Sequence, residues 1–147
     1  MKKIILTIIL SALFLCGCDA VNEKEQESEY YSDLAKTQEI TAISADTSDI
    51  LQKMTEKQEI SDFISALDIE HWELESLPET AKLTGTFQFS QEETLKFGQD
   101  ASDREISTIC EILCYEDIPY LTLKTAGVKI SFRVSETTME YLTQYFQ

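Results

Sequence analysis

Strict alternation of apolar and polar residues between Leu83 and Ser90 limits the fold of this chain more than any other feature. The stretch reads LTGTFQFS, which places leucine, glycine and two phenylalanines on one side and threonines, glutamine and serine on the other. A two-residue period is that of a β-strand with one buried and one exposed face. Half-buried strands of this kind are typical of antiparallel sheets. The pattern therefore predicts an antiparallel sheet with one apolar face that needs covering.

Six further short runs predict the remaining strands, and turn-forming residues separate several of them. These runs cover residues 39–45, 50–54, 94–97, 105–115, 120–124 and 128–134. The first two flank a segment, Asp46-Thr47-Ser48-Asp49, whose residue types favour a turn and so predict a β-hairpin. One helix over residues 48–67 is the alternative for this region. Lys57 and Gln58 would interrupt its apolar stripe, so the hairpin is favoured.

Two segments show the period of an amphipathic helix. The apolar face of the first consists of Ile60, Phe63, Ile64 and Leu67. A capping box formed by Thr55 and Gln58 predicts that this helix begins at Thr55, and we expect it to end near Asp68. The following residues, 68–81, are predicted to form a loop through Pro78.

The second helix is predicted over residues 135–147. Its cap candidates are Ser135 and Thr137, and its apolar stripe is Met139, Leu142 and Phe146. Together the patterns predict a single α+β domain over residues 39–147, with the element order β-β-α-β-β-β-β-β-α. Strands joined by short turns form an antiparallel sheet of about 5–7 strands, with two helices packed on one face.

The N-terminus is predicted to be an export signal. It opens with Met1-Lys2-Lys3 and continues from Ile4 to Leu15 as a mainly apolar run without a charged residue. A membrane-spanning helix needs roughly 20 apolar residues, whereas the apolar core of a secretory signal needs about 7–15. The length of the run therefore favours a signal peptide.

The residues after this run, Leu15-Cys16-Gly17-Cys18, resemble the lipobox of bacterial lipoprotein signal peptides. The resemblance implies cleavage between Gly17 and Cys18, removal of residues 1–17, and a diacylglyceryl group on the Cys18 thiol. Cys16 is the poorer acceptor, because bulky Phe14 and Leu15 would then occupy positions where small residues are wanted. Cys16 at position −2 departs from the usual alanine, serine or threonine, although cysteine is also small. The implied location is the extracytoplasmic face of the cell membrane.

Residues 18–38 are predicted to be the lipidated cysteine and a disordered acidic tether. This segment is charged and has few β-branched residues and no long apolar pattern. Two or more acyl chains on one cysteine would anchor the protein without a spanning helix.

The charge of the chain excludes one class of partner and favours another. The chain has 27 acidic and 12 basic residues, a net charge of −15, and residues 1–17 contain two of the lysines and no acid. Nucleic-acid binding depends on lysine and arginine contacts with phosphate, so we expect none. Anionic lipid should repel the body of the domain, whereas cationic partners should be attracted to it.

The two remaining cysteines are predicted to be small buried hydrophobes. Cys110 and Cys114 lie four residues apart on one face of the strand predicted over residues 105–115. At roughly 3.3 Å per residue they are about 13 Å apart, too far for a disulfide. No second cysteine pair or nearby histidine completes a metal site, so neither a metal nor any other cofactor is expected.

The one cluster with ligand-binding character surrounds His71 and Trp72, between several acidic residues. A single histidine makes a nucleophilic triad improbable, and the chain has no G-x-S-x-G turn or glycine-rich phosphate loop. The structural interpretation is that His71 caps carbonyls at a helix end and Trp72 folds over the core. Contact with a ligand is the functional alternative for both residues.

These observations predict a membrane-anchored extracytoplasmic lipoprotein with a small non-catalytic binding domain and no enzymatic activity. An envelope protein or a cationic exported peptide is the expected partner. Three alternatives remain open: an envelope enzyme that uses acidic residues with His71, an accessory subunit of an envelope complex, and an immunity protein against a cationic peptide.

Overall fold

A computed structural model describes residues 34–93, 98, 100 and 105–147. The elements follow one another as β1 (Glu39–Ser44), β2 (Ile50–Met54), α2 (Lys57–Ala66), η1 (Ile69–His71), β3 (Glu73–Leu74), β4 (Leu83–Glu92), β5 (Ile106–Tyr115), β6 (Tyr120–Thr125), β7 (Val128–Arg133), α3 (Glu136–Thr143) and η3 (Gln144–Phe146). The strands form one antiparallel sheet in the order β2-β1-β4-β5-β6-β7-β3. The predicted α+β class is therefore confirmed.

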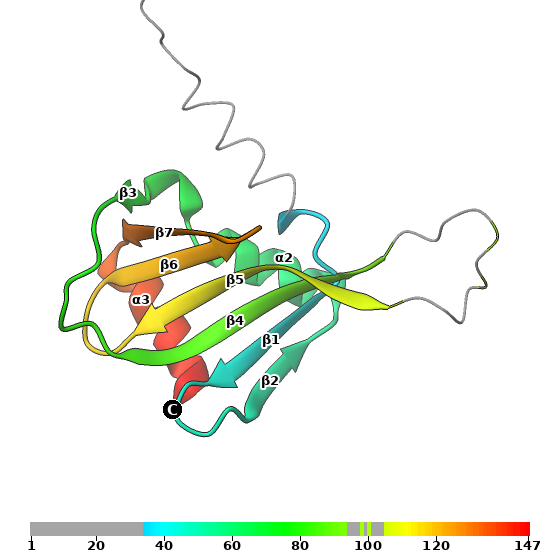
Figure 1. Ribbon diagram of the computed structural model, residues 1–147, viewed down its shortest axis with the longest axis horizontal. Helices are drawn as coiled ribbons and strands as arrows, with labels where there is room; N and C mark the ends of the chain where they lie inside the picture. Colours follow the sequence, from blue (N-terminus) through cyan, green and yellow to red (C-terminus); the bar gives the residue numbers. More distant parts are fainter. Residues whose placement is uncertain (1–33, 94–97, 99, 101–104) are drawn as a thin grey trace, which may run out of the picture. The chain divides into compact units, whose positions relative to one another are not determined.

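Both helices lie on the same side of the sheet, behind it in Figure 1. The register explains which side chains they cover, because Ala42, Phe87, Ile112, Leu123 and Ile130 lie in one row across five strands. Apolar residues alternate along each of these strands, so their apolar sides share one face of the sheet. Burial of that face against the helices supplies the hydrophobic stabilisation of the domain.

The centre of this core is an aromatic cluster around Phe63 of α2. The Phe63 ring lies 4.8 Å from that of Phe87, 6.1 Å from that of Phe89 and 5.5 Å from that of Tyr145, measured between centroids. Phe63, Phe87 and Phe89 are completely buried. The alternation in β4 therefore directs Phe87 and Phe89 towards the helical side of the sheet, as the sequence predicts.

Gly85 in β4 allows the C-terminal segment to reach the sheet. A Cβ atom at this position would lie 2.2 Å from the ring of Phe146 and 2.8 Å from the carbonyl oxygen of Ile43. The ring of Phe146 packs at 4.9 Å from that of Phe87. The close approach of η3 to β4 therefore depends on the absence of a side chain at residue 85.

The hairpin of β1 and β2 confirms the prediction for residues 39–54, whereas the predicted start of the following helix differs. Helix α2 begins one residue after Glu56, which serves as N-cap without a side-chain hydrogen bond, so the predicted capping box at Thr55 is wrong. Thr55 follows directly on β2, where the chain crosses from the sheet to the helical layer. Gln58 instead donates to Asp62 at 2.8 Å, one turn along the helix.

Strand β3 was not predicted, because two residues are too few to show a period. It forms where Glu73 and Leu74 pair with Arg133 and Phe132 at the edge of β7. The strand predicted over residues 94–97 lies outside the described residues, as does most of the loop predicted after it.

The C-terminal helix begins as predicted. The Ser135 hydroxyl accepts a hydrogen bond from the backbone N–H of Thr138 at 3.1 Å, which is the geometry of an N-cap. Met139 and Leu142 on its apolar stripe are buried.

Among the described residues, no helix has the length and apolar character needed to cross a membrane.

Candidate functional site

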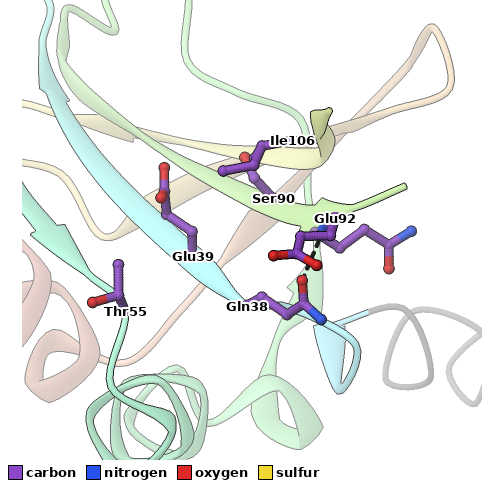
Figure 2. Close-up of a pocket in the computed structure, with 7 residues that line it drawn as sticks. Gln38, Glu39, Thr55, Ser90, Glu92 and Ile106 are labelled. Carbon is purple, nitrogen blue, oxygen red and sulfur yellow. Dashed lines mark hydrogen bonds between the residues drawn. The ribbon is translucent and has the colours of Figure 1, made fainter. Parts of the chain in front are cut away.

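A shallow hollow lies at the end of the sheet where β1 and β4 meet the start of α2, and most of the residues around it have polar side chains. It has a volume of about 220 Å³ and is lined by Gln38, Glu39, Thr55, Ser90, Gln91, Glu92 and Ile106. Figure 2 shows the side chains of Glu39, Glu92 and Thr55 among the residues that line it, with the two carboxylates pointing in different directions. All of the titratable side chains in this lining are carboxylic acids.

Strand register brings the two carboxylates to one face of the sheet. Glu39 is paired with Ser90, and Glu92 lies two residues further along β4, where it is paired with Ile106. Their neighbours Ile40 and Phe89 are buried towards the helices. Because side chains alternate along a strand, Glu39 and Glu92 both lie on the face that the helices leave uncovered. We call this the open face.

Gln38 fixes the base of the hollow through two hydrogen bonds to β4. Its backbone N–H donates to the carbonyl of Ser90 at 2.9 Å, and its side-chain oxygen accepts from the backbone N–H of Glu92 at 2.8 Å. Figure 2 shows the second of these bonds as a dashed line. The segment before β1 is therefore bound to β4 one residue before the predicted start of the domain at Glu39.

Glu39 already binds an ammonium group. Its carboxylate lies 2.9 Å from Nζ of Lys53 on the neighbouring strand β2 and accepts a long hydrogen bond of 3.4 Å from the Thr41 hydroxyl. The side chain of Lys53 is 49% exposed, whereas that of Glu39 is 16% exposed. The carboxylate is thus held in place while the lysine remains accessible to solvent.

A second, wider hollow adjoins the first and shares Gln38, Thr55, Gln91 and Glu92 with it. Its volume is about 620 Å³, and its other lining residues are Ala35, Lys36, Thr37, Lys57 and Ile60. The buried hydroxyl of Thr37 has no hydrogen-bond partner in the described part of the chain. The two hollows therefore adjoin each other beside the beginning of α2.

The open face continues from the hollow as a row of polar and charged residues. The register aligns Lys53, Thr41, Gln88, Glu111, Lys124 and Lys129 across six strands. Lys124 forms an ion pair with Glu111, and Gln88 donates to the same carboxylate at 3.1 Å. The hydrogen bond from Lys124, aided by that from Gln88, lowers the pKa of Glu111 against the opposing effect of burial.

His71 and Trp72, the residues singled out from the sequence, lie at the other end of α2 and away from the hollow's lining. The indole N–H of Trp72 donates to the carbonyl of Leu67 at 2.7 Å, and its ring packs 5.3 Å from that of Phe132. The imidazole Nδ1 of His71 lies 2.7 Å from the carboxylate of Asp68. Trp72 therefore satisfies the carbonyl at the helix end, a role expected of His71.

The environment of His71 is that of an exposed ion pair. Its side chain is 73% exposed, and the hydrogen bond and charge of Asp68 raise its pKa. Asp68 has a positive φ of 52°, which ends the α-helical conformation and turns the chain into η1. Gly17 and Cys18, the predicted cleavage and lipidation residues, lie outside the described residues.

Cys110 and Cys114 are both buried on β5 and are not joined in a disulfide, as predicted. Burial raises the pKa of the Cys114 thiol, so the nucleophilic thiolate is disfavoured. In the described ranges no three His, Cys, Asp or Glu side chains come together as a metal site.

No pattern in the sequence predicted the hollow, apart from the alternate positions of Ser90 and Glu92. Gln38 was assigned to the tether and Glu39 to the first residue of a strand. Their meeting with β4 depends on strand order, since β1 pairs with β4 although 38 residues lie between the end of one strand and the start of the other. A pairing of this kind leaves no local pattern.

Comparison with known proteins adds a distant likeness only. No family model and no curated protein matches the chain. Among solved structures, that of a thioesterase-like protein from Clostridium sporogenes ATCC 15579 is similar, with a TM-score of 0.44, 13% identity, and coverage of 75% of this chain and 94% of that chain. This finding contradicts the prediction that the chain is not an enzyme, and that prediction is withdrawn. A likeness at this level assigns no activity and no residue role to the chain.

Proposed function

We propose that this chain is a lipoprotein, anchored through Cys18 at the extracytoplasmic face of the cell membrane, whose α+β domain binds a cationic partner. The anchor is supported by Leu15-Cys16-Gly17-Cys18 after a short apolar run. The partner is an envelope protein or an exported peptide. The observation that carries the binding role is the hollow on the open face, whose described lining offers carboxylate, amide and hydroxyl groups and no basic side chain.

The charge of the whole chain supports the same partner. A net charge of −15 attracts cations over a distance and raises their encounter rate, an effect that salt weakens. Complementary charge at the contact surface then contributes specificity. A binding site for a cation within a strongly acidic protein is therefore favoured both in approach and in contact.

The anchor is tested by the intact mass of protein extracted from membranes, with the Cys18→Ala variant beside the wild type. The expected wild-type mass lacks residues 1–17 and includes acyl chains, and the variant shows neither change. A full-length or unmodified wild-type mass would refute the lipoprotein assignment.

The binding role is tested by chemical crosslinking at the membrane followed by identification of the captured partners. The expected partners carry clusters of lysine or arginine, and a matched acidic lipoprotein expressed at the same level serves as the control. Capture of acidic or neutral partners alone would refute a cationic partner while leaving the anchor intact.

A further inference from the structure

We propose that the wider hollow, beside the beginning of α2, binds the C-terminal carboxylate of a cationic peptide through the Thr37 hydroxyl, the Lys57 ammonium and the first N–H groups of the helix. This inference rests on the proposed cationic partner, and it names the end of that partner which the domain recognises. Figure 2 draws Gln38, Thr55 and Glu92, which line both this hollow and the shallow one.

The hydroxyl of Thr37 is the observation that points to a ligand. Thr37 is only 9% exposed and lines the wider hollow, and its Oγ1 has no hydrogen-bond partner within the described part of the chain. A buried hydroxyl without a partner destabilises a folded protein, so such groups are rare and each calls for an explanation, such as a missing water or ion. Because the hollow borders this residue, a ligand oxygen that enters it can supply the missing acceptor.

The first turn of α2 supplies further donors to the same place. Glu56 is the N-cap without a side-chain hydrogen bond, and over the described ranges no group accepts from the backbone N–H of Gln58 or Glu59. The sequence predicted that Thr55 would cap this helix, but Thr55 lines the hollow instead. Unpaired N–H groups and the helix dipole together favour a carboxylate at such a terminus.

The charge of the lining differs from that of the whole protein. Lys36 and Lys57 line the hollow with a single acid, Glu92, whereas the chain has a net charge of −15. The acidic surroundings would repel a small free anion. A peptide end with basic side chains beside it avoids this repulsion, because its carboxylate meets the donors while its basic groups meet the acids. The ligand is therefore the carboxyl end of a cationic chain.

The size of the hollow suits the last residue of a peptide. Its volume of about 620 Å³ lies within the range of roughly 300–1,000 Å³ that is typical of small-ligand sites. Ile60 is 5% exposed and belongs to the lining, three residues after Lys57 and hence on the same side of α2. It offers apolar contact to the last side chain of the peptide, so we expect an apolar C-terminal residue such as leucine.

The experiment is an NMR titration of the isotope-labelled, lipidated full-length mature chain in detergent with three acetylated peptides. The first is acetyl-lysyl-lysyl-alanyl-leucine with a free carboxyl end, and the second is its C-terminal amide. The third is acetyl-lysyl-lysyl-glutamyl-leucine amide, which has the net charge of the first but a carboxylate only on a side chain. The free acid should bind at least about tenfold more tightly than the other two and should shift the amide signals of Thr37 and Gln58.

The direction of this preference separates the site from attraction by overall charge. The amide is one unit more positive than the free acid. A protein with a net charge of −15 should therefore prefer the amide if overall charge alone decides. Tighter binding of the free acid requires donors that contact its carboxylate.

The variant Thr37→Val tests the buried hydroxyl. It should weaken binding of the free acid about fivefold, change that of the amide less than about twofold, and leave the urea midpoint no lower, because the unbound domain has no hydrogen bond to lose there. Thr122→Val is the matched control. The Thr122 hydroxyl lies 2.8 Å from that of Tyr115 and 2.9 Å from that of Ser131, so its loss should lower the urea midpoint and leave the affinity unchanged.

A second pair of variants tests the positive charge beside the helix. Lys57→Met should weaken binding of the free acid about tenfold, since it removes a charge-assisted partner of the carboxylate. Lys129→Met removes the same charge from β7 and should change the affinity less than about twofold.

The outcomes distinguish the site from the function. An amide that binds as tightly as the free acid would refute the carboxylate site and leave a cationic partner attracted by overall charge. Equal binding of the glutamyl peptide would refute recognition of the chain end. A Thr37→Val protein with a lower urea midpoint and unchanged affinity would assign the hydroxyl to a structural water and refute its role. Failure of all three peptides to bind at about 50 mM salt, with crosslinked cationic partners still recovered from membranes, would refute the site while the proposed function stands.

Discussion

Substitution of Gly85 by alanine should destabilise the domain through one identifiable contact. The added Cβ would lie 2.2 and 2.3 Å from two ring atoms of Phe146 and 2.8 Å from the carbonyl oxygen of Ile43. Real Cβ atoms do not approach this closely, so the C-terminal ring has to leave its place on β4. The backbone oxygen of Ile43 adds strain that no side-chain movement relieves.

The size of the effect follows from what the ring of Phe146 loses. Burial of a phenylalanine side chain contributes about 1.5–3 kcal/mol, and its pairing with Phe87 at 4.9 Å adds about 0.5–1.5 kcal/mol. Phe146 is partly exposed but mostly buried, so about two-thirds of the burial term applies. Alanine in a strand regains roughly 0.5–1 kcal/mol over glycine. These terms leave a loss of about 0.5–3 kcal/mol, and overpacking against the Ile43 carbonyl adds to it. We therefore expect Gly85→Ala to lower the free energy of unfolding by about 1–3 kcal/mol.

Urea unfolding of the mature chain, followed by circular dichroism, measures this loss. Phe146→Ala is the matched variant, and the double variant completes a thermodynamic cycle. Because the ring is absent from Phe146→Ala, Gly85→Ala should cost less in that background than in the wild type. A Gly85→Ala protein within about 0.5 kcal/mol of the wild type, or two additive effects, would refute the account of the close approach.

Three further predictions concern other contacts. Trp72→Phe keeps an aromatic ring but loses the hydrogen bond to the carbonyl of Leu67, so it should lower the free energy of unfolding by about 1 kcal/mol in a urea titration. His71→Ala should leave the urea midpoint unchanged. A larger effect at His71 than at Trp72 would reverse these roles. Folding lowers the pKa of Glu111, so its contribution to the stability of the domain is present above its ordinary pKa of 4.5 and is lost as the pH falls through the folded value. The thermal unfolding midpoint of Glu111→Gln should therefore depend less on pH below 5 than that of the wild type. An unchanged pH dependence would argue against the Lys124 contact. The Cys114 thiol should resist a thiol reagent in the native protein and react once the protein is unfolded in urea, and rapid native labelling at Cys114 would contradict its burial.

Local patterns in the sequence were sufficient for the elements that bury one face. The alternation in β4 and the helical spacing of the apolar residues in α2 follow from the periods of strand and helix, and the side chains they predicted to be buried include Phe63 and Phe87. Ser135 was identified as an N-cap because its hydroxyl acts within one turn of the chain. These contacts are short in sequence, so residue order alone encodes them.

Elements that depend on a distant partner were missed or placed wrongly. Two residues of β3 show no period and become a strand only because β7 offers an open edge. Thr55 has the residue type of an N-cap but remains outside the helix, since Glu56 takes that position where the chain passes from β2 to α2. The capping of α2 by Trp72 likewise depends on how the chain turns at Asp68.

The sequence by itself determined the α+β class, the buried stripes of the helices and strands, and the expectation of a lipid anchor at Cys18. Only the tertiary structure decided which polar residues line one hollow, because the pairing of β1 with β4 places Glu39 and Glu92 at the same end of the sheet. That pairing depends on the order of the seven strands in the sheet, which arises from long-range strand pairing and from the packing of the buried strand residues against two helices. A site assembled across strands in this way has no signature in any one segment.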